Sequence, residues 1–158
     1  MRGERDTSAI LHDISAATDV DVVFMQQELE ESCKNMKFVF SDVPNIIKAL
    51  RNQGILCVIA TDNMDTFRQF TIKHMNLADI FDDFLLSNEL GVLKFDKNQK
   101  NEGIPFFDEF LAKHGFRYSD AVLVDDCIDD GTYAQKGLRT LHATSPEVFR
   151  EHLNWLRE

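Results

Sequence analysis

Four short segments rich in apolar or β-branched residues are expected to form β-strands. Two of them, residues 55–60 and 121–124, are uninterrupted apolar runs. Such runs are typical of strands that are buried on both faces of a parallel sheet. The other two expected strands cover residues 83–86 and 138–142.

Around these strands, apolar residues recur at the three- and four-residue spacing of amphipathic helices. Val20–Met25 also has the composition of a strand, so this stretch is open to both interpretations. From Val43 onward helix and strand alternate, which predicts a three-layer α/β domain with a parallel sheet. The expected helices cover residues 7–17, 21–35, 43–52, 64–74, 105–114, 131–136 and 146–156.

Polar residues follow directly after three of the expected strands. Because the carboxyl ends of parallel strands lie at one edge of a sheet, we expect these residues to converge on one site. The three groups are Thr61-Asp62-Asn63, Ser87-Asn88 and Asp125-Asp126.

The last group belongs to an acidic stretch in which the apolar run 121–124 leads into Asp125, Asp126, Asp129 and Asp130. Clustered carboxylates repel one another, and a hard cation such as Mg²⁺ commonly compensates them. The alternative is a solvated acidic turn. Asp125 could also accept backbone hydrogen bonds without touching metal, and we expect Asp129 to face solvent.

The polar residues at the strand ends suit the binding of a phosphate group. Thr61 and Asn63 can donate hydrogen bonds to phosphate oxygens, and Lys94 can balance negative charge. A metal ion held by Asp126 and Asp130 would screen the phosphate from the carboxylates. The alternatives are that Lys94 is a surface lysine, that Thr61 only terminates a strand, and that Asp62 and Asn63 only cap a helix.

Composition narrows the classes of partner. The chain has 158 residues, with 27 acidic against 17 basic residues and a net charge of −10. This charge argues against nucleic acid and anionic membranes as partners, while a small phosphorylated molecule still fits where a metal and a few cations face it. No apolar stretch is long enough to span a membrane. The cysteines, Cys33, Cys57 and Cys127, lie in or beside apolar runs, and we expect reduced thiols in a cytoplasmic protein.

Three segments resemble motifs of the haloacid dehalogenase-like (HAD) hydrolase superfamily. VPNIIKALRNQGILCVIATDN is similar to the second motif, a strand that ends in Thr or Ser. SNELGVLKFD is similar to the third motif, which supplies a lysine, although Phe95 stands where proline is frequent. AVLVDDCIDD, followed by Ala134 and Gly137, is similar to the fourth, acidic motif.

The resemblance implies a three-layer, Rossmann-like α/β core over residues 41–158, preceded by a helical cap-like segment over residues 1–40. It also implies Mg²⁺-dependent hydrolase activity of the small-molecule phosphatase type. The implied catalytic residues are Thr61 and Lys94, the substrate-binding residues are Thr61, Asp62, Asn63 and Lys94, and the metal ligands are Asp125, Asp126 and Asp130.

The chain departs from this family at the first motif, a strand ending in Asp-x-Asp that supplies the aspartate nucleophile. Asp19-Val20-Asp21 has the right letters, but no apolar run leads into it. Val22–Met25 is apolar but is followed by glutamines, and Asp42 lacks a second Asp. We therefore predict a catalytically impaired HAD-like hydrolase domain. The alternative is a non-catalytic binding or interaction domain that retains the scaffold.

The family sheet order places the missing first strand between the strands at 55–60 and 121–124. Unpaired strand edges inside a sheet are unfavourable, so we expect the gap to be closed. The options are direct pairing of these two strands, a substitute strand at residues 20–25 or 37–40, or a strand exchanged with another copy in a homodimer.

Overall fold

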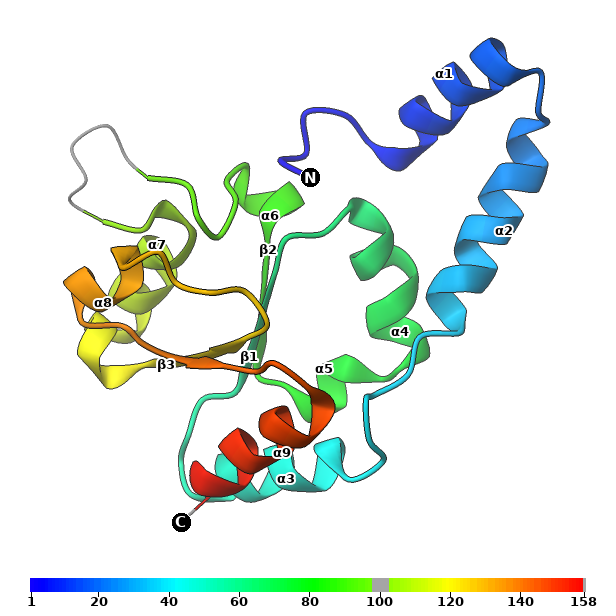
Figure 1. Cartoon of the computed structure of the whole chain (residues 1–158). Helices are drawn as coiled ribbons and strands as arrows, with labels where there is room; N and C mark the ends of the chain where they lie inside the picture. Colours follow the sequence, from blue (N-terminus) through cyan, green and yellow to red (C-terminus); the bar gives the residue numbers. More distant parts are fainter. Residues whose placement is uncertain (98–102, 158) are drawn as a thin grey trace. The chain divides into compact units, whose positions relative to one another are not determined.

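The computed structural model describes residues 1–97 and 103–157 (Figure 1). The chain divides into two compact units. Unit 1 comprises Met1–Phe38 and Leu56–Lys94, and unit 2 comprises Val39–Ile55 and Phe95–Glu158.

Unit 1 contains a helical hairpin, a pair of parallel strands and several short helices. Its two strands, β1 and β2, pair in a register that places Thr61 opposite Leu86. The elements of unit 1 are α1 (Thr7–Thr18), α2 (Val22–Lys34), β1 (Val58–Thr61), the π-helix η1 (Phe67–Thr71), α4 (Ile72–His74), α5 (Leu77–Ile80), β2 (Asp83–Leu86) and α6 (Ser87–Leu90).

Side-chain caps explain where the two helices of the hairpin begin. The Asp6 carboxylate accepts the Ala9 N–H at 2.7 Å, and the Asp21 carboxylate accepts the Phe24 N–H at 2.8 Å. An aspartate at this position satisfies a helical N–H that has no partner within the helix. The predicted helices at 7–17 and 21–35 are confirmed, and the ambiguous stretch after Val20 is helical from Val22 onward.

The core of unit 1 forms where β2 meets η1, α4 and α5. Phe67, Ile72, Leu77 and Leu86 are buried in one cluster. Helix α2 runs alongside η1 and buries none of its own residues fully (Figure 1).

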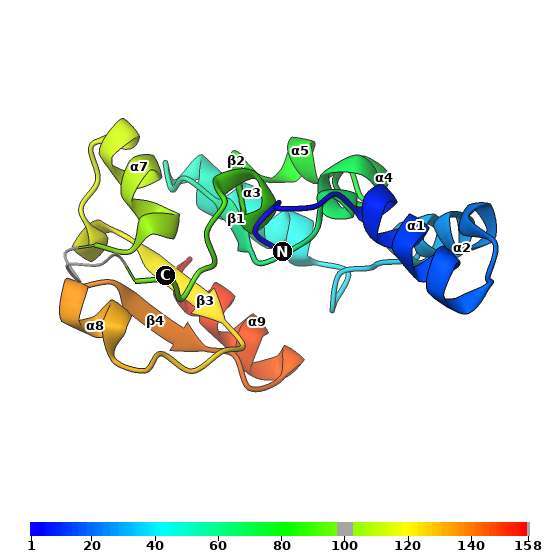
Figure 2. The ribbon, with the colours of Figure 1, turned by 90° about the horizontal axis from the view of Figure 1, so that it is seen from above.

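Unit 2 contains the second pair of parallel strands, β3 and β4, whose register places Asp125 opposite His142 (Figure 2). Arg150 connects α9 to the start of α3. Its guanidinium group donates a hydrogen bond to Asp42 Oδ1 at 2.8 Å, and its Cζ atom lies 4.4 Å from the centre of the Phe40 ring. The elements of unit 2 are α3 (Val43–Asn52), α7 (Pro105–His114), the 3₁₀ helix η2 (Tyr118–Asp120), β3 (Val122–Asp125), α8 (Thr132–Lys136), β4 (Arg139–His142) and α9 (Pro146–Trp155).

The predicted fold class is wrong. The chain does not form a three-layer, Rossmann-like sheet, because its strands form two separate two-stranded parallel sheets, β1-β2 and β3-β4. The two observed pairs are parallel, as expected of the predicted sheet, but β2 and β3 belong to different sheets. In the described residues, however, no strand joins β1 to β3, and a parallel sheet extends only by pairing along strand edges.

Among the described residues, none of the expected closures of the gap from within the chain is formed. Strands β1 and β3 do not pair with each other. Val22–Lys34 is helical, and residues 37–40 form no strand. A strand exchanged with another copy stays a prediction.

Most element boundaries agree with the pattern of the sequence, with local exceptions. The strand expected at 55–60 is regular only over Val58–Thr61, and the helix expected at 64–74 is a π-helix that continues into α4. The division into a cap-like segment at 1–40 and a core at 41–158 stays a prediction. No helix within residues 1–97 and 103–157 combines the length and the apolar character that crossing a membrane requires.

Candidate functional site

In unit 1, the carboxyl ends of β1 and β2 bring two of the predicted polar groups to one edge. Thr61 and Leu86 are register partners, so Asp62-Asn63 and Ser87-Asn88 follow from adjacent strand ends. Sequence position alone predicted this convergence, because both strands are parallel.

Hydrogen bonds hold this edge together. The Asn63 N–H donates to Ser87 Oγ at 3.0 Å, and the Ser87 hydroxyl lies 2.8 Å from the Met1 carbonyl oxygen, to which it donates. The Lys94 backbone N–H donates to Asp62 Oδ1 at 3.0 Å. Asp62 therefore fixes the loop that carries Lys94, a role that differs from the helix cap considered as its alternative.

Asn88 belongs to one of the polar groups expected at this edge, although no role in binding was assigned to it. Its Oδ1 atom is buried and, among the described residues, is the one buried side-chain oxygen or nitrogen that makes no hydrogen bond. Buried acceptors of this kind are rare and usually meet a water, an ion or a ligand.

In unit 2, the acidic loop begins at the carboxyl end of β3. Asp125, Asp126 and Cys127 each offer a ligand atom, and these atoms lie within 4.8 Å of one another. The Cys127 N–H donates to Asp125 Oδ1 at 2.8 Å, which confirms that Asp125 accepts a backbone hydrogen bond. Mg²⁺ prefers oxygen ligands, so the two carboxylates fit this ion and the thiol does not.

Asp129 supports the acidic loop, although we expected it to face solvent. Its carboxylate accepts the N–H groups of Gly131, Tyr133 and Ala134 at 3.0–3.1 Å, and the residue is half-buried. Three donors on one carboxylate anchor the loop to the start of α8.

Asp130 makes different contacts from the two preceding acids. Its Oδ1 accepts the Thr132 N–H at 3.0 Å and the Thr132 hydroxyl, and its Oδ2 accepts Lys97 Nζ at 3.2 Å. The Thr132 hydroxyl, the Thr132 N–H and Lys97, in this order, lower the pKa of Asp130 to about 2. Both of its oxygens are thus engaged within the loop, and its role as a metal ligand stays a prediction.

These contacts predict the pH dependence of the acidic loop. The pKa of Asp130 lies below the value of about 3.9 for an unfolded chain, so its contacts stabilise the folded loop above that pH. This stabilisation is lost as the pH falls through about 2. In an NMR titration of the carboxyl carbons, Thr132→Val should raise the pKa of Asp130 more than Lys97→Met does. Titration of Asp130 near pH 4 in the unmodified chain would contradict the contacts.

His142 lies beside the acidic loop and was not among the residues expected there. It ends β4 in register with Asp125, and its Nε2 lies 3.1 Å from the Asp126 carbonyl oxygen. His152 Nε2 in turn lies 3.1 Å from the His142 carbonyl oxygen. These contacts connect the acidic loop to β4 and α9, and the position of His142 at a strand end was its signal.

The aspartates considered for the missing first motif have structural roles. Asp19 ends α1 with a φ of 60°, Asp21 caps α2, and Asp42 pairs with Arg150. None of the four strands in the described residues ends in Asp-x-Asp.

The predicted site residues fall into two groups. Thr61, Asp62, Asn63 and Lys94 belong to unit 1, whereas Asp125, Asp126 and Asp130 belong to unit 2. A single site formed by both groups stays a prediction. No family model matches the chain, and no curated protein matches it.

Proposed function

We propose that the chain binds a small phosphorylated molecule together with Mg²⁺, as a catalytically impaired relative of the HAD-like hydrolases of the phosphatase type. One observation carries the proposal: Asp125 and Asp126 bring two carboxylates together where a parallel strand pair ends. Ligand sites of α/β proteins form preferentially at such ends.

Asp125 and Asp126 would hold the metal, and Asp130 would complete the set if it exchanged its present contacts. Mg²⁺ often binds through one or two carboxylates plus phosphate oxygens and waters. When bound, it supplies positive charge next to the phosphate oxygens. Two carboxylates without a third predict weak affinity.

Taken by itself, unit 1 offers groups at its strand ends that would bind a phosphate. The Thr61 hydroxyl and the Asn63 amide have the donors that phosphate oxygens accept, and the Lys94 ammonium group balances their charge. Asp62 would act as a positioning residue, since it accepts the backbone N–H of Lys94.

The second candidate is a non-catalytic binding or interaction domain. One observation favours it. Asp19 ends α1 and Asp21 caps α2, and neither follows a strand, as the aspartate nucleophile of the family would. In either case we propose a cytoplasmic protein. A homodimer that supplies the missing strand stays part of the proposal, and sedimentation velocity would test it.

Metal binding is tested by titration of the ¹⁵N-labelled chain with Mn²⁺, which broadens NMR signals near its site. We expect broadening centred on Asp125 and Asp126, reversed by Mg²⁺ with a Kd on the order of 1 mM. Asp126→Asn should weaken binding at least about tenfold, because it removes an anionic ligand.

Glu151→Gln is the matched control, since it removes an exposed acid of α9 in the same unit, and it should bind as the unmodified chain does. Broadening that is spread over all exposed acids would contradict a defined site. Submicromolar affinity would contradict a site of two carboxylates.

A further inference from the structure

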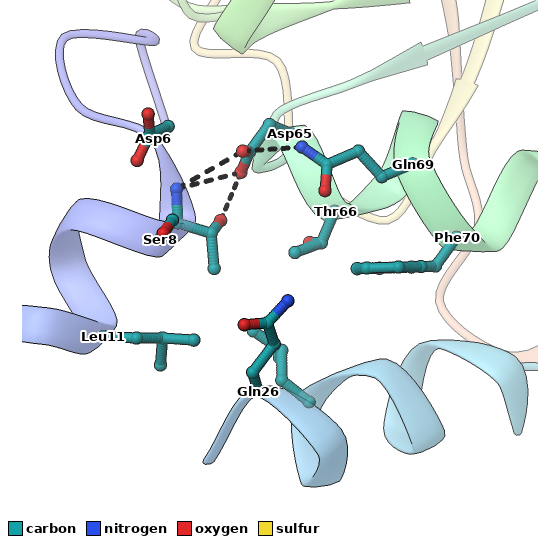
Figure 3. Close-up of a pocket in the computed structure, with 10 residues that line it drawn as sticks. Asp6, Ser8, Leu11, Gln26, Asp65, Thr66, Gln69 and Phe70 are labelled. Atoms are coloured by element: carbon teal, nitrogen blue, oxygen red, sulfur yellow. Dashed lines mark hydrogen bonds between the residues drawn. The ribbon is translucent and has the colours of Figure 1, made fainter. Parts of the chain in front are cut away.

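A pocket with a volume of about 150 Å³ lies within unit 1, between the α1–α2 hairpin and residues 65–70 (Figure 3). None of the residues assigned above to phosphate or metal lines it. The segment that forms one wall includes the π-helix η1. Turns of π-helix are rare and occur frequently at functional sites.

The lining combines apolar and amide side chains. Leu11 of α1, Leu29 of α2 and Phe70 of η1 supply the apolar surface. Gln26 and Gln69 supply two carboxamides. In Figure 3, Leu11, Gln26 and Phe70 surround one open space, and Asp65 lies on the side opposite Gln26. A ligand would therefore meet an aromatic ring and polar groups together.

The charge of the pocket is negative. The Asp65 carboxylate is half-buried and accepts hydrogen bonds from Thr7, at N and Oγ1, and from Gln69 Nε2 at 3.0 Å. No basic side chain of the described residues forms a salt bridge with Asp65. Asp6 adds a second carboxylate, and the described residues that line the pocket include no Lys, Arg or His.

We propose that this pocket binds a small organic ammonium ion with a compact apolar body. A half-buried carboxylate without a cationic partner favours a positive charge nearby. The Phe70 ring attracts a cation through its electron-rich face, and the glutamine carbonyl oxygens can accept N–H donors. A cavity of this volume accommodates a molecule of about the size of benzene.

The probe is benzylammonium, compared with benzyl alcohol and benzoate, which keep the ring and change the charge. Binding is followed in ¹H–¹⁵N spectra through the Gln26 and Gln69 side-chain amides and the backbone of residues 65–70. We expect saturable binding of benzylammonium with a Kd on the order of 1 mM, as suits a ligand of this size. Benzyl alcohol should bind at least about tenfold more weakly, and benzoate should not bind, because the lining carries only negative charge.

Variants locate the binding. Gln26→Trp should fill the pocket and abolish binding, whereas Gln27→Trp, on the neighbouring exposed position of α2, should retain it. Phe70→Leu should weaken binding about two- to fivefold through loss of the cation–π contact. Asp65 itself is left unchanged, because it also holds Thr7.

Two results would overturn the proposal. Equal affinity for benzylammonium and benzyl alcohol would show that the pocket does not select a cation. Equal affinity of Gln26→Trp and the unmodified chain would show that the ligand binds elsewhere. Neither result depends on Mg²⁺ or phosphate, so the proposed function is tested separately.

Discussion

Incubated with a chromogenic phosphate monoester and Mg²⁺, the 158-residue chain is expected to show no turnover by a covalent route. This chemistry needs a carboxylate placed for in-line attack on phosphorus. Thr61, Lys94 and a metal can bind and polarise a phosphate, but none of them supplies that nucleophile. Loss of the nucleophile costs about 10⁶ in kcat in a well-studied hydrolase of another class, and a typical kcat is about 10 s⁻¹. We therefore expect a rate about six orders of magnitude below that of a competent hydrolase.

The same assay on Asp126→Asn and Lys94→Ala tests whether any measured turnover comes from the predicted site. Neither substitution should change a rate that is already at the background. Robust turnover that both substitutions abolish would show that a nucleophile is present after all. It would also count against the capping roles of Asp19 and Asp21 and against the ion pair of Asp42.

Thermal unfolding in the presence of a ligand tests whether the chain binds phosphate at all. Inorganic phosphate or vanadate should raise the midpoint of thermal unfolding, because a ligand that binds only the folded state stabilises it by mass action. Protection without turnover supports a binding domain. Absence of both would contradict the phosphate-binding proposal.

The helices and their ends could be predicted from the sequence because their signals are local. Asp6 and Asp21 cap helices within three residues of their own position, and Gly115 ends α7 in a left-handed conformation that glycine adopts readily. Strand β2 was predicted with its observed bounds, since an apolar run followed by Ser87 is equally local.

The assembly of the sheet could not be predicted in the same way. Whether β1 pairs with β3 depends on residues more than 60 positions apart and on a strand that the described chain does not contain. The roles of Asp129 and His142 also depend on neighbours in space. Asp129 was expected in solvent because acidic turns are usually solvated, but the start of α8 lies against it and supplies three N–H donors. The kinds of residue at the candidate site could therefore be predicted from the sequence, whereas the groups that they contact could not.

Tyr133→Ala is expected to destabilise unit 2 by about 3–5 kcal/mol, the usual cost of truncating a buried aromatic residue. Tyr133 is 1% exposed. Its ring stacks on Phe95 with centroids 5.1 Å apart and meets the edge of Phe107 at 5.9 Å. Because α8 begins beside Asp129, the cavity would also loosen the helix start that anchors the acidic loop. Unfolding in urea is followed by the fluorescence of Trp155, the one tryptophan in the chain, which lies in α9 of the same unit.

Two matched variants isolate the contribution of the ring. Tyr133→Phe keeps the aromatic packing and should cost no more than about 1 kcal/mol, the net value of one hydrogen bond. Gln135→Ala, at an exposed position of the same helix, should stay within about 0.5 kcal/mol of the unmodified chain. A loss below about 1 kcal/mol for Tyr133→Ala would mean that the ring does not fill the core of unit 2. If the loss is large, Tyr133→Ala should also weaken the Mn²⁺ broadening at Asp125 and Asp126, since Asp129 of the same loop bonds the N–H groups at the start of α8.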